Sequence, residues 1–260
     1  FASAGVSMSG TGGAGVFGAA GADLSVYSGV DLGFAISGAS DNGMTFSASL
    51  DMGGGQTLDV GDFELDTQDM GTDDNASVAI GVGGVTITLS QDGVDDLYDD
   101  DIAGDIGISG AMGDLSYSVV TGLEDADPTS ISIGYSAGAI SGSVATSDQG
   151  DASTVSVSYA MGDITLSAES DTDRTGADTS TVGVSYSMAD GMTVSVEESE
   201  GVIEASVAYS SGAISVGVTA DDATAESWEA TMAYDLGGGA TFNLGTNQDE
   251  TTFAGVGFSF

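Results

Sequence analysis

The chain has 260 residues, with 42 glycines, one proline, no cysteine and no histidine, and its formal net charge is −40 because 41 acidic residues accompany a single basic one. Without cysteine or histidine there is no disulfide framework, no zinc site of the common kinds and no catalytic site that needs an imidazole or a thiolate. One arginine and no lysine cannot form a surface that follows a phosphate backbone, so we expect no nucleic-acid partner.

The chain holds no run of about 18 apolar residues, so the sequence predicts no membrane-spanning helix. The opening segment, FASAGVSMSG, lacks the positive charge and apolar core of a secretion signal, and we expect either no signal or a mature chain. Apolar and polar residues alternate instead, as at Val155, Val157 and Tyr159. Such alternation is typical of β-strands with one apolar and one polar face.

In chain order, the alternation predicts eighteen strands, with sixteen as the alternative, centred near residues 10, 30, 47, 79, 87, 108, 118, 133, 143, 156, 167, 183, 195, 205, 216, 231, 243 and 255. Tight glycine-containing turns, which favour hairpins, are predicted at 40–43, 81–84, 111–114, 136–139, 160–163, 187–191, 210–213 and 235–239. We expect the other connections to be longer and acidic, at 54–75, 91–105, 123–128, 147–152, 171–178 and 220–225.

Aromatic residues mark the ends of the predicted strands. A tyrosine recurs every 23–27 residues just before a tight turn, a spacing that fits a membrane hairpin of two strands. Tyrosine and tryptophan favour the membrane–water interface, so we predict an aromatic girdle. Its members are Tyr135, Tyr159, Tyr186, Tyr209, Tyr234 and Trp228.

The acids inside strands occupy the polar face. A membrane barrel turns that face toward a wet lumen, whereas a soluble sandwich turns it toward bulk water, and both satisfy the alternation. The predicted lumen-facing acids are Asp31, Glu169, Glu197, Glu204 and Glu229. The outward faces carry small residues, which suit lipid better than the dense core of a soluble protein.

The last predicted strand ends in AGVGFSF, with Phe258 and Phe260 on its apolar face. This ending looks like the terminal strand of bacterial outer-membrane barrels, where such residues are read by the assembly machinery. With VSMSGTGGAGVF near 6–17, LGFAISGASDNGMTFSASL at 32–50, VAIGVGGVTITLSQDG at 78–93 and YDLGGGA at 234–240, the chain resembles the trimeric general porins of Gram-negative bacteria, most closely the alphaproteobacterial (Rhodobacter-like) type.

The resemblance implies an all-β fold, a transmembrane antiparallel β-barrel over 1–260, with short periplasmic turns and longer outer loops. It implies a non-enzymatic, water-filled diffusion channel of the outer membrane for ions and small hydrophilic solutes, with no cofactor. It also implies a homotrimer in contact with lipid and lipopolysaccharide. The Gly- and Ala-rich segment near 4–22 suits a subunit interface.

In that family the third outer connection folds inward and narrows the pore; here it would be 91–105. A constriction of carboxylates without basic partners attracts cations and repels anions. The predicted constriction residues are Asp92, Asp95, Asp96, Tyr98, Asp99, Asp100 and Asp101. Solvation of these acids in an outer loop is the alternative. Carboxylates also suit Ca²⁺ or Mg²⁺, so weak divalent binding at Asp95, Asp96, Asp99, Asp100 and Asp101 stays open.

Two departures from the family pattern weigh on this interpretation. Those porins usually have sixteen strands, and their pores carry basic residues opposite the acidic loop, whereas Arg174 is the only basic residue here. The main rival is an acidic extracellular structural or adhesive β-protein, such as a solenoid or surface-layer component. A secreted acid-adapted or halophilic enzyme is a second rival, but the sequence shows no convergent catalytic site.

Overall fold

The computed structural model describes residues 3–19, 21–68, 77–99, 102–124, 129–223 and 227–260. In this part of the chain the regular structure is all β, with nineteen strands. No helix in it is long and apolar enough to cross a membrane. The first nine strands are β1 (Ser3–Gly18), β2 (Ser25–Ala39), β3 (Thr45–Asp59), β4 (Glu64–Gln68), β5 (Ser77–Val82), β6 (Val85–Asp95), β7 (Ala103–Met112), β8 (Leu115–Thr121) and β9 (Thr129–Ala137).

The remaining strands are more even in length. They are β10 (Ile140–Ser147), β11 (Ser153–Met161), β12 (Ile164–Thr172), β13 (Asp178–Ser187), β14 (Met192–Ser199), β15 (Val202–Ser211), β16 (Ile214–Asp221), β17 (Trp228–Gly237), β18 (Ala240–Asn247) and β19 (Thr252–Ser259).

The described strands belong to one sheet in which antiparallel neighbours follow one another along the chain. β1 pairs with both β2 and β19, with Thr11 opposite Ser259 and Gly18 opposite Thr252. Pairing of the first strand with the last removes free sheet edges, which is the connectivity of a closed barrel. β4 stands apart from this series because its pairing partner is the second half of β3, whereas β5 pairs with the first half.

All eighteen predicted strand positions therefore fall in observed strands, and β4 is an addition that alternation did not predict. It lies inside the segment 54–75, which we expected to be a loop. Two further connections differ from expectation. The strands β6 and β7 extend into 91–105 and leave only 96–102 between them. The tight turn at Glu200 and Gly201, which joins β14 and β15, was not among the predicted connections.

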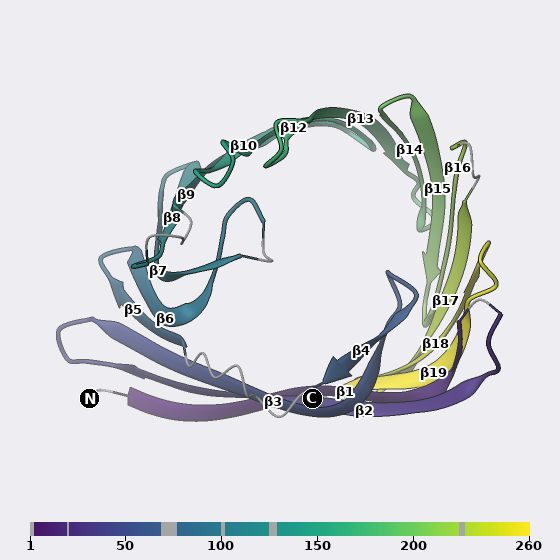
Figure 1. Ribbon diagram of the computed structural model, residues 1–260, viewed down its shortest axis with the longest axis horizontal. Helices are drawn as coiled ribbons and strands as arrows, with labels where there is room; N and C mark the ends of the chain where they lie inside the picture. The colour runs from purple at the N-terminus through teal and green to yellow at the C-terminus, as the bar shows by residue number, and fades with distance from the viewer. Residues whose placement is uncertain (1–2, 20, 69–76, 100–101, 125–128, 224–226) are drawn as a thin grey trace. The chain divides into compact units, whose positions relative to one another are not determined.

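The contacts divide the chain into two compact units. The first comprises Phe1–Ser7, Phe34–Leu50 and Asp73–Val182, and the second Met8–Gly33, Asp51–Thr72 and Gly183–Phe260. In the first unit the strands form a curved sheet, and the connection between β6 and β7 lies on its concave side (Figure 1). In the second unit the β3–β4 hairpin lies on the concave side of its own strands (Figure 1).

Many large apolar side chains of the described residues are exposed. Few described apolar residues are buried, among them Tyr27, Phe63 and Phe253, whereas many large apolar side chains are 37% or more exposed. A water-soluble protein would bury these residues in a core. The arrangement is that of a sheet whose apolar face meets lipid.

Candidate channel and constriction loop

The short connection between β6 and β7 is held by a network centred on Asp96. The sequence QDGVD breaks the β6–β7 register between Leu89 and Val94, with Asp92 in the left-handed region at φ 49°. The chain then turns at Asp96, whose Oδ1 accepts hydrogen bonds from the backbone nitrogens of Tyr98 (2.9 Å) and Asp99 (3.1 Å). This is the turn that an aspartate forms with the backbone two and three residues ahead.

The same loop is attached to the strands beside it. The backbone nitrogen of Leu97 donates to Ser130 Oγ (3.0 Å), and Ser147 Oγ donates to Asp96 Oδ2 (3.1 Å). Ser130 is fully buried, and Ser147 and Asp96 are nearly so. Buried serine hydroxyls in β9 and β10 thus provide hydrogen-bond partners for polar groups of the loop. These bonds hold the loop against the polar face of the sheet.

Two further contacts, one with β12 and one with the connection after it, complete the attachment of the loop. Tyr98 Oη donates to Asp171 Oδ2 at 3.0 Å. Arg174 forms ion pairs with Asp99 (Nε to Oδ2, 3.3 Å) and Asp96 (Nη2 to Oδ1, 4.0 Å). The Asp96 carboxylate is fully buried, whereas the Arg174 side chain is about one quarter exposed. The single positive charge of the chain is therefore used to hold this loop.

Ionisation of the loop follows from these contacts. Burial, followed by the hydrogen bond to Asp171 and the charges of Asp171, Asp173 and Asp99, raises the pKa of Tyr98 above its usual range. Hydrogen bonds from Ala177 and Thr175, the largest from the Ala177 backbone, lower the pKa of Asp173. The raised pKa thus favours the neutral, hydrogen-bond-donating form of Tyr98.

The predicted constriction residues have different environments. Asp92 and Asp95 are exposed, Tyr98 and Asp99 are half-buried, and Asp96 is buried among the bonds described above. Asp100 and Asp101 lie outside the described residues. Among the residues with defined positions, no group of three or more acids is arranged to hold a metal ion. The hypothesis of Ca²⁺ or Mg²⁺ binding by this loop stays a prediction.

The predicted lumen acids follow the polar face of their strands. Glu197 lies directly opposite Glu204 across β14 and β15, and Glu204 lies opposite Asp221 across β15 and β16. The negative charges of Glu204 and Asp62 act on the Glu229 carboxylate. Sequence analysis did not single out Asp62 and Asp221, although both are acids in or beside the predicted connections. The other two predicted lumen acids are Asp31 in β2 and Glu169 in β12.

The predicted girdle residues are all 41–45% exposed. Five tyrosines lie at the turn ends of β9, β11, β13, β15 and β17, and Trp228 begins β17 at the other end. On the seam of the sheet, Phe258 lies opposite Gly12, and Phe260 exchanges backbone hydrogen bonds with Gly10 at 3.0 and 3.1 Å. The phenylalanines predicted as an assembly signal therefore also help to join β19 to β1.

An antiparallel sheet with this connectivity, an apolar outer face and an acidic inner loop defines the class of outer-membrane channel-forming barrels. The sequence matches the Gram-negative porin family over residues 1–254. The chain belongs to that family; it is a non-enzymatic channel protein of the bacterial outer membrane. The family assignment argues against the alternative interpretation of the chain as an extracellular structural or adhesive protein.

Solved structures agree with the family in fold. A triple mutant of the Rhodopseudomonas blastica porin aligns with a TM-score of 0.63 and 16% identity, covering 98% of this chain and 100% of that one. A different mutant of the same porin gives a TM-score of 0.63, 17% identity and the same coverage. No curated protein sequence matches the chain. At these identities the likeness shows the barrel fold alone.

Proposed function

We propose that the chain forms a passive, water-filled diffusion channel that prefers cations. The observation that carries this proposal is the distribution of charge: 41 acids accompany one arginine, and that arginine is ion-paired to Asp96 and Asp99. Without a free positive charge in the described wall, nothing offsets the field of the lumen carboxylates. Such a pore concentrates cations within a Debye length of about 8–10 Å and repels anions.

The loop 96–102 is the first source of selectivity. Its bonds to Ser130, Ser147 and Asp171 support a fixed position against the inner face of the first unit. Asp92 and Asp95 are the exposed carboxylates beside it, and Asp99 is half-buried. In this proposal Asp96 and Tyr98 position the loop, whereas Asp92 and Asp95 meet the passing ions. Asp100 and Asp101 keep the constriction role that the sequence suggested.

The lumen face of the strands is the second source. Glu197, Glu204 and Asp221 lie side by side on neighbouring strands, which costs repulsion between like charges. A row of facing carboxylates is destabilising for the fold but favourable for a mobile cation that passes between them. Asp31, Glu169 and Glu229 extend the same acidic face in the proposed channel.

We also propose that the protein assembles as a homotrimer in lipid and lipopolysaccharide. The outward faces of β1 and β2 expose Met8 (56%), Val26 (82%) and Val30 (37%), beside small residues such as Ala14. Small residues allow close approach of neighbouring backbones. The half-exposed tyrosines and Trp228 suit the membrane interfaces, and Phe258 and Phe260 suit recognition by the assembly machinery.

The reversal potential of the refolded protein in a planar lipid bilayer under a KCl gradient tests the function. A potential close to the K⁺ equilibrium value, with conductance steps in groups of three, supports the cation-preferring trimer. A potential near zero or of opposite sign would refute the cation preference while the channel remained. Failure of the folded protein to insert and conduct would refute the channel itself. Crosslinking of the protein in detergent tests the trimer separately.

A further inference from the structure

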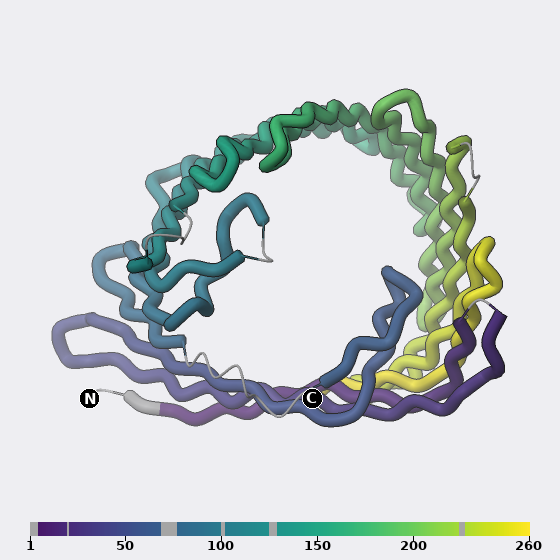
Figure 2. The backbone as a smooth tube through the Cα atoms, in the orientation of Figure 1, coloured from purple at the N-terminus to yellow at the C-terminus, as the bar shows by residue number. Residues whose placement is uncertain are grey.

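The second half of β3 has a different neighbour on one side from the first half. β3 pairs with β5 only through Thr45–Ser49, and its last residues, Gly55–Asp59, pair instead with β4 at Glu64–Gln68. The tube in Figure 2 shows this segment as a separate hairpin. We call residues 51–68 the inner hairpin.

Two glycines let the backbone of the inner hairpin approach β2, the neighbour of β3 in the sheet, at close range. A Cβ at Gly29 would lie 2.5 Å from the backbone carbon and oxygen of Gln56, and a Cβ at Gly55 would overlap the carbonyl oxygen of Ser28. Gly55 also has φ +83°, which other residues rarely adopt. The backbones of β2 and the hairpin therefore touch, and the hairpin is seated on the barrel wall.

The tip of the hairpin is anchored by an aromatic pair. Phe63 is 6% exposed and Phe253 is 3% exposed, and their ring centroids are 5.2 Å apart at an interplanar angle of 59°. Phe253 points to the opposite side of β19 from Val256 and Phe258, which are exposed on the apolar face. The hairpin thus lies on the lumen face of the second unit.

The hairpin has two faces of different chemistry. Leu58 pairs with Leu65, and both are half-buried together with Val60, whereas Glu64 and Asp66 are exposed. The exposed Asp62 adds its charge to the field at Glu229 on β17. An apolar face against the wall and acids on the free face are expected of a segment whose free face meets water inside a channel.

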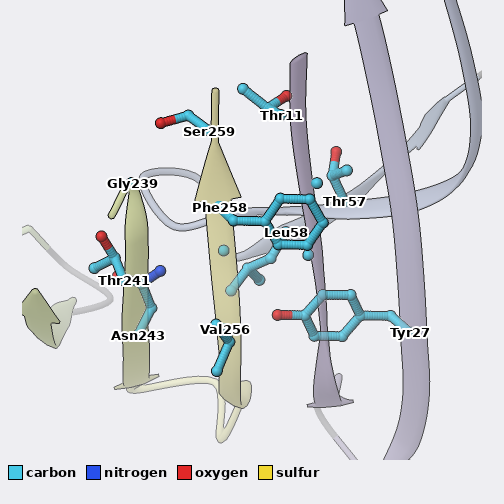
Figure 3. A pocket seen from close by; sticks show the side chains of 13 residues that line it. Thr11, Tyr27, Thr57, Leu58, Gly239, Thr241, Asn243, Val256, Phe258 and Ser259 are labelled. Carbon is cyan, nitrogen blue, oxygen red and sulfur yellow. The ribbon is translucent and has the colours of Figure 1, made fainter. Parts of the chain in front are cut away.

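A cavity of about 380 Å³ lies beside the hairpin and is lined by Thr57 and Leu58 from the hairpin and by Tyr27, Thr241 and Asn243 from the strands (Figure 3). Figure 3 shows the Tyr27 ring beside the β1 strand, with the residues of β18 and β19 on the other side of the space. The lining is neutral and partly polar. The hairpin therefore does not contact the strands along its whole length, and Phe63 fixes its tip.

We propose that the inner hairpin is a second constriction element of the channel, separate from the loop 96–102, and that its acids line the conducting path. The inference rests on the proposed channel function. Because the hairpin occupies lumen space, it lowers the conductance of the open pore. Because its free face carries Asp62, Glu64 and Asp66, it also adds to the cation preference.

The decisive variant replaces residues 56–67 with Gly-Ser. Gly55 lies opposite Gln68 in the antiparallel ladder, so a two-residue turn can join them without moving the wall. We expect single-channel conductance in KCl to rise and the reversal potential to move toward zero. Phe63→Ser, which removes only the anchor, should give noisier currents with a higher maximum.

Cysteine modification supplies a test that does not alter the backbone. The chain has no cysteine, so Asp62→Cys carries a unique thiol. A positively charged methanethiosulfonate reagent should lower the conductance in one step for each pore of the trimer, whereas Asp114→Cys, at the exposed turn between β7 and β8, should not respond. Unchanged conductance in the shortened variant, or an unreactive Asp62→Cys, would overturn the proposed second constriction. The proposed channel function would still stand if the wild-type protein formed channels. Absence of wild-type channels would instead defeat the proposed function.

Discussion

Arg174 and Asp99 form an ion pair, with Arg174 Nε 3.3 Å from Asp99 Oδ2, that joins the connection after β12 to the connection between β6 and β7. The same guanidinium reaches Asp96, whose carboxylate is fully buried, at 4.0 Å. A buried carboxylate without a positive partner is costly. The single arginine of this acidic chain therefore supplies the positive partner that the buried Asp96 carboxylate of the loop needs.

The first prediction concerns this arginine. Arg174→Ala should loosen the loop at a cost on the order of 1–3 kcal/mol, because Asp96 loses its only described positive neighbour while staying buried. Single-channel recordings should show flickering current steps that the wild type lacks. Arg174→Lys, which keeps the charge, should flicker less. If Arg174→Ala gave currents as steady as those of the wild type, the hydrogen bonds of the serines and the tyrosine would be enough to hold the loop.

The second prediction concerns alkaline pH. Because the pKa of Tyr98 is raised in the folded protein, its contribution to loop docking is present below the usual tyrosine pKa of about 10 and is lost as pH rises through the higher folded value. Ionised Tyr98 would also repel Asp171, to which it now donates a hydrogen bond. Current noise should therefore increase in that alkaline window.

The comparison variant for the alkaline effect is Tyr98→Phe, which cannot ionise and makes no hydrogen bond to Asp171. It should be noisier than wild type at neutral pH and should lack the Tyr98-dependent increase above pH ~10. The same alkaline increase in both proteins would assign the change to other groups and contradict this role of Tyr98.

Alternation predicted the strands well because each one meets lipid on one face and polar groups on the other. Val155, Val157 and Tyr159 show the pattern, and they are 43–50% exposed in β11. The terminal phenylalanines were also found by this pattern, and Phe260 pairs with Gly10 on β1. Local patterning suffices where each residue's environment is set by its own strand.

The inner hairpin and the loop attachment could not be predicted in the same way. Gly55 and Phe63 lie in a short acidic segment that resembles a loop, and their partners, Ser28 and Phe253, are distant in the sequence. The role of Asp96 depended on Ser147 in β10, which sequence analysis had no reason to single out. Contacts between distant segments leave no periodic signal.

The third prediction concerns the acids that lie opposite one another on β14, β15 and β16. Glu204 lies opposite Glu197 on one side and Asp221 on the other, so Glu204→Gln should remove repulsion and stabilise the fold by about 0.2–1 kcal/mol. The same substitution should reduce cation selectivity, measured by the reversal potential. Added salt should shrink both differences because it screens the charges.

A neutral pair on the same strands serves as the control for Glu204. Ser195 and Ser206 lie opposite each other with 2.6 Å between their hydroxyl oxygens. Ser206→Ala breaks that hydrogen bond without changing charge, so selectivity should not move. If Glu204→Gln left selectivity at the wild-type value in low salt, this acid would not contribute to the conducting path.

The fourth prediction concerns the seam between β1 and β19. A Cβ at Gly10 would lie 2.7 Å from Phe260 Cζ, 2.8 Å from Leu32 Cδ2 and 3.0 Å from the carbonyl oxygen of Asp31. Gly10→Val should therefore overpack the seam at a cost of about 1–3 kcal/mol. The measurement is the temperature at which the folded band on a detergent gel converts to the unfolded mobility, and we expect it to fall.

A second glycine on β1 and a compensating substitution separate this effect from a general loss of flexibility. A Cβ at Gly5 would meet no atom within 4 Å, so Gly5→Val should change the conversion temperature little. Phe260→Ala removes one of the groups that a valine at position 10 would strike, so adding it to Gly10→Val should recover part of the loss. Equal effects of the two glycine substitutions would show that strand stiffness, and not the contact between Gly10 and Phe260, governs the seam.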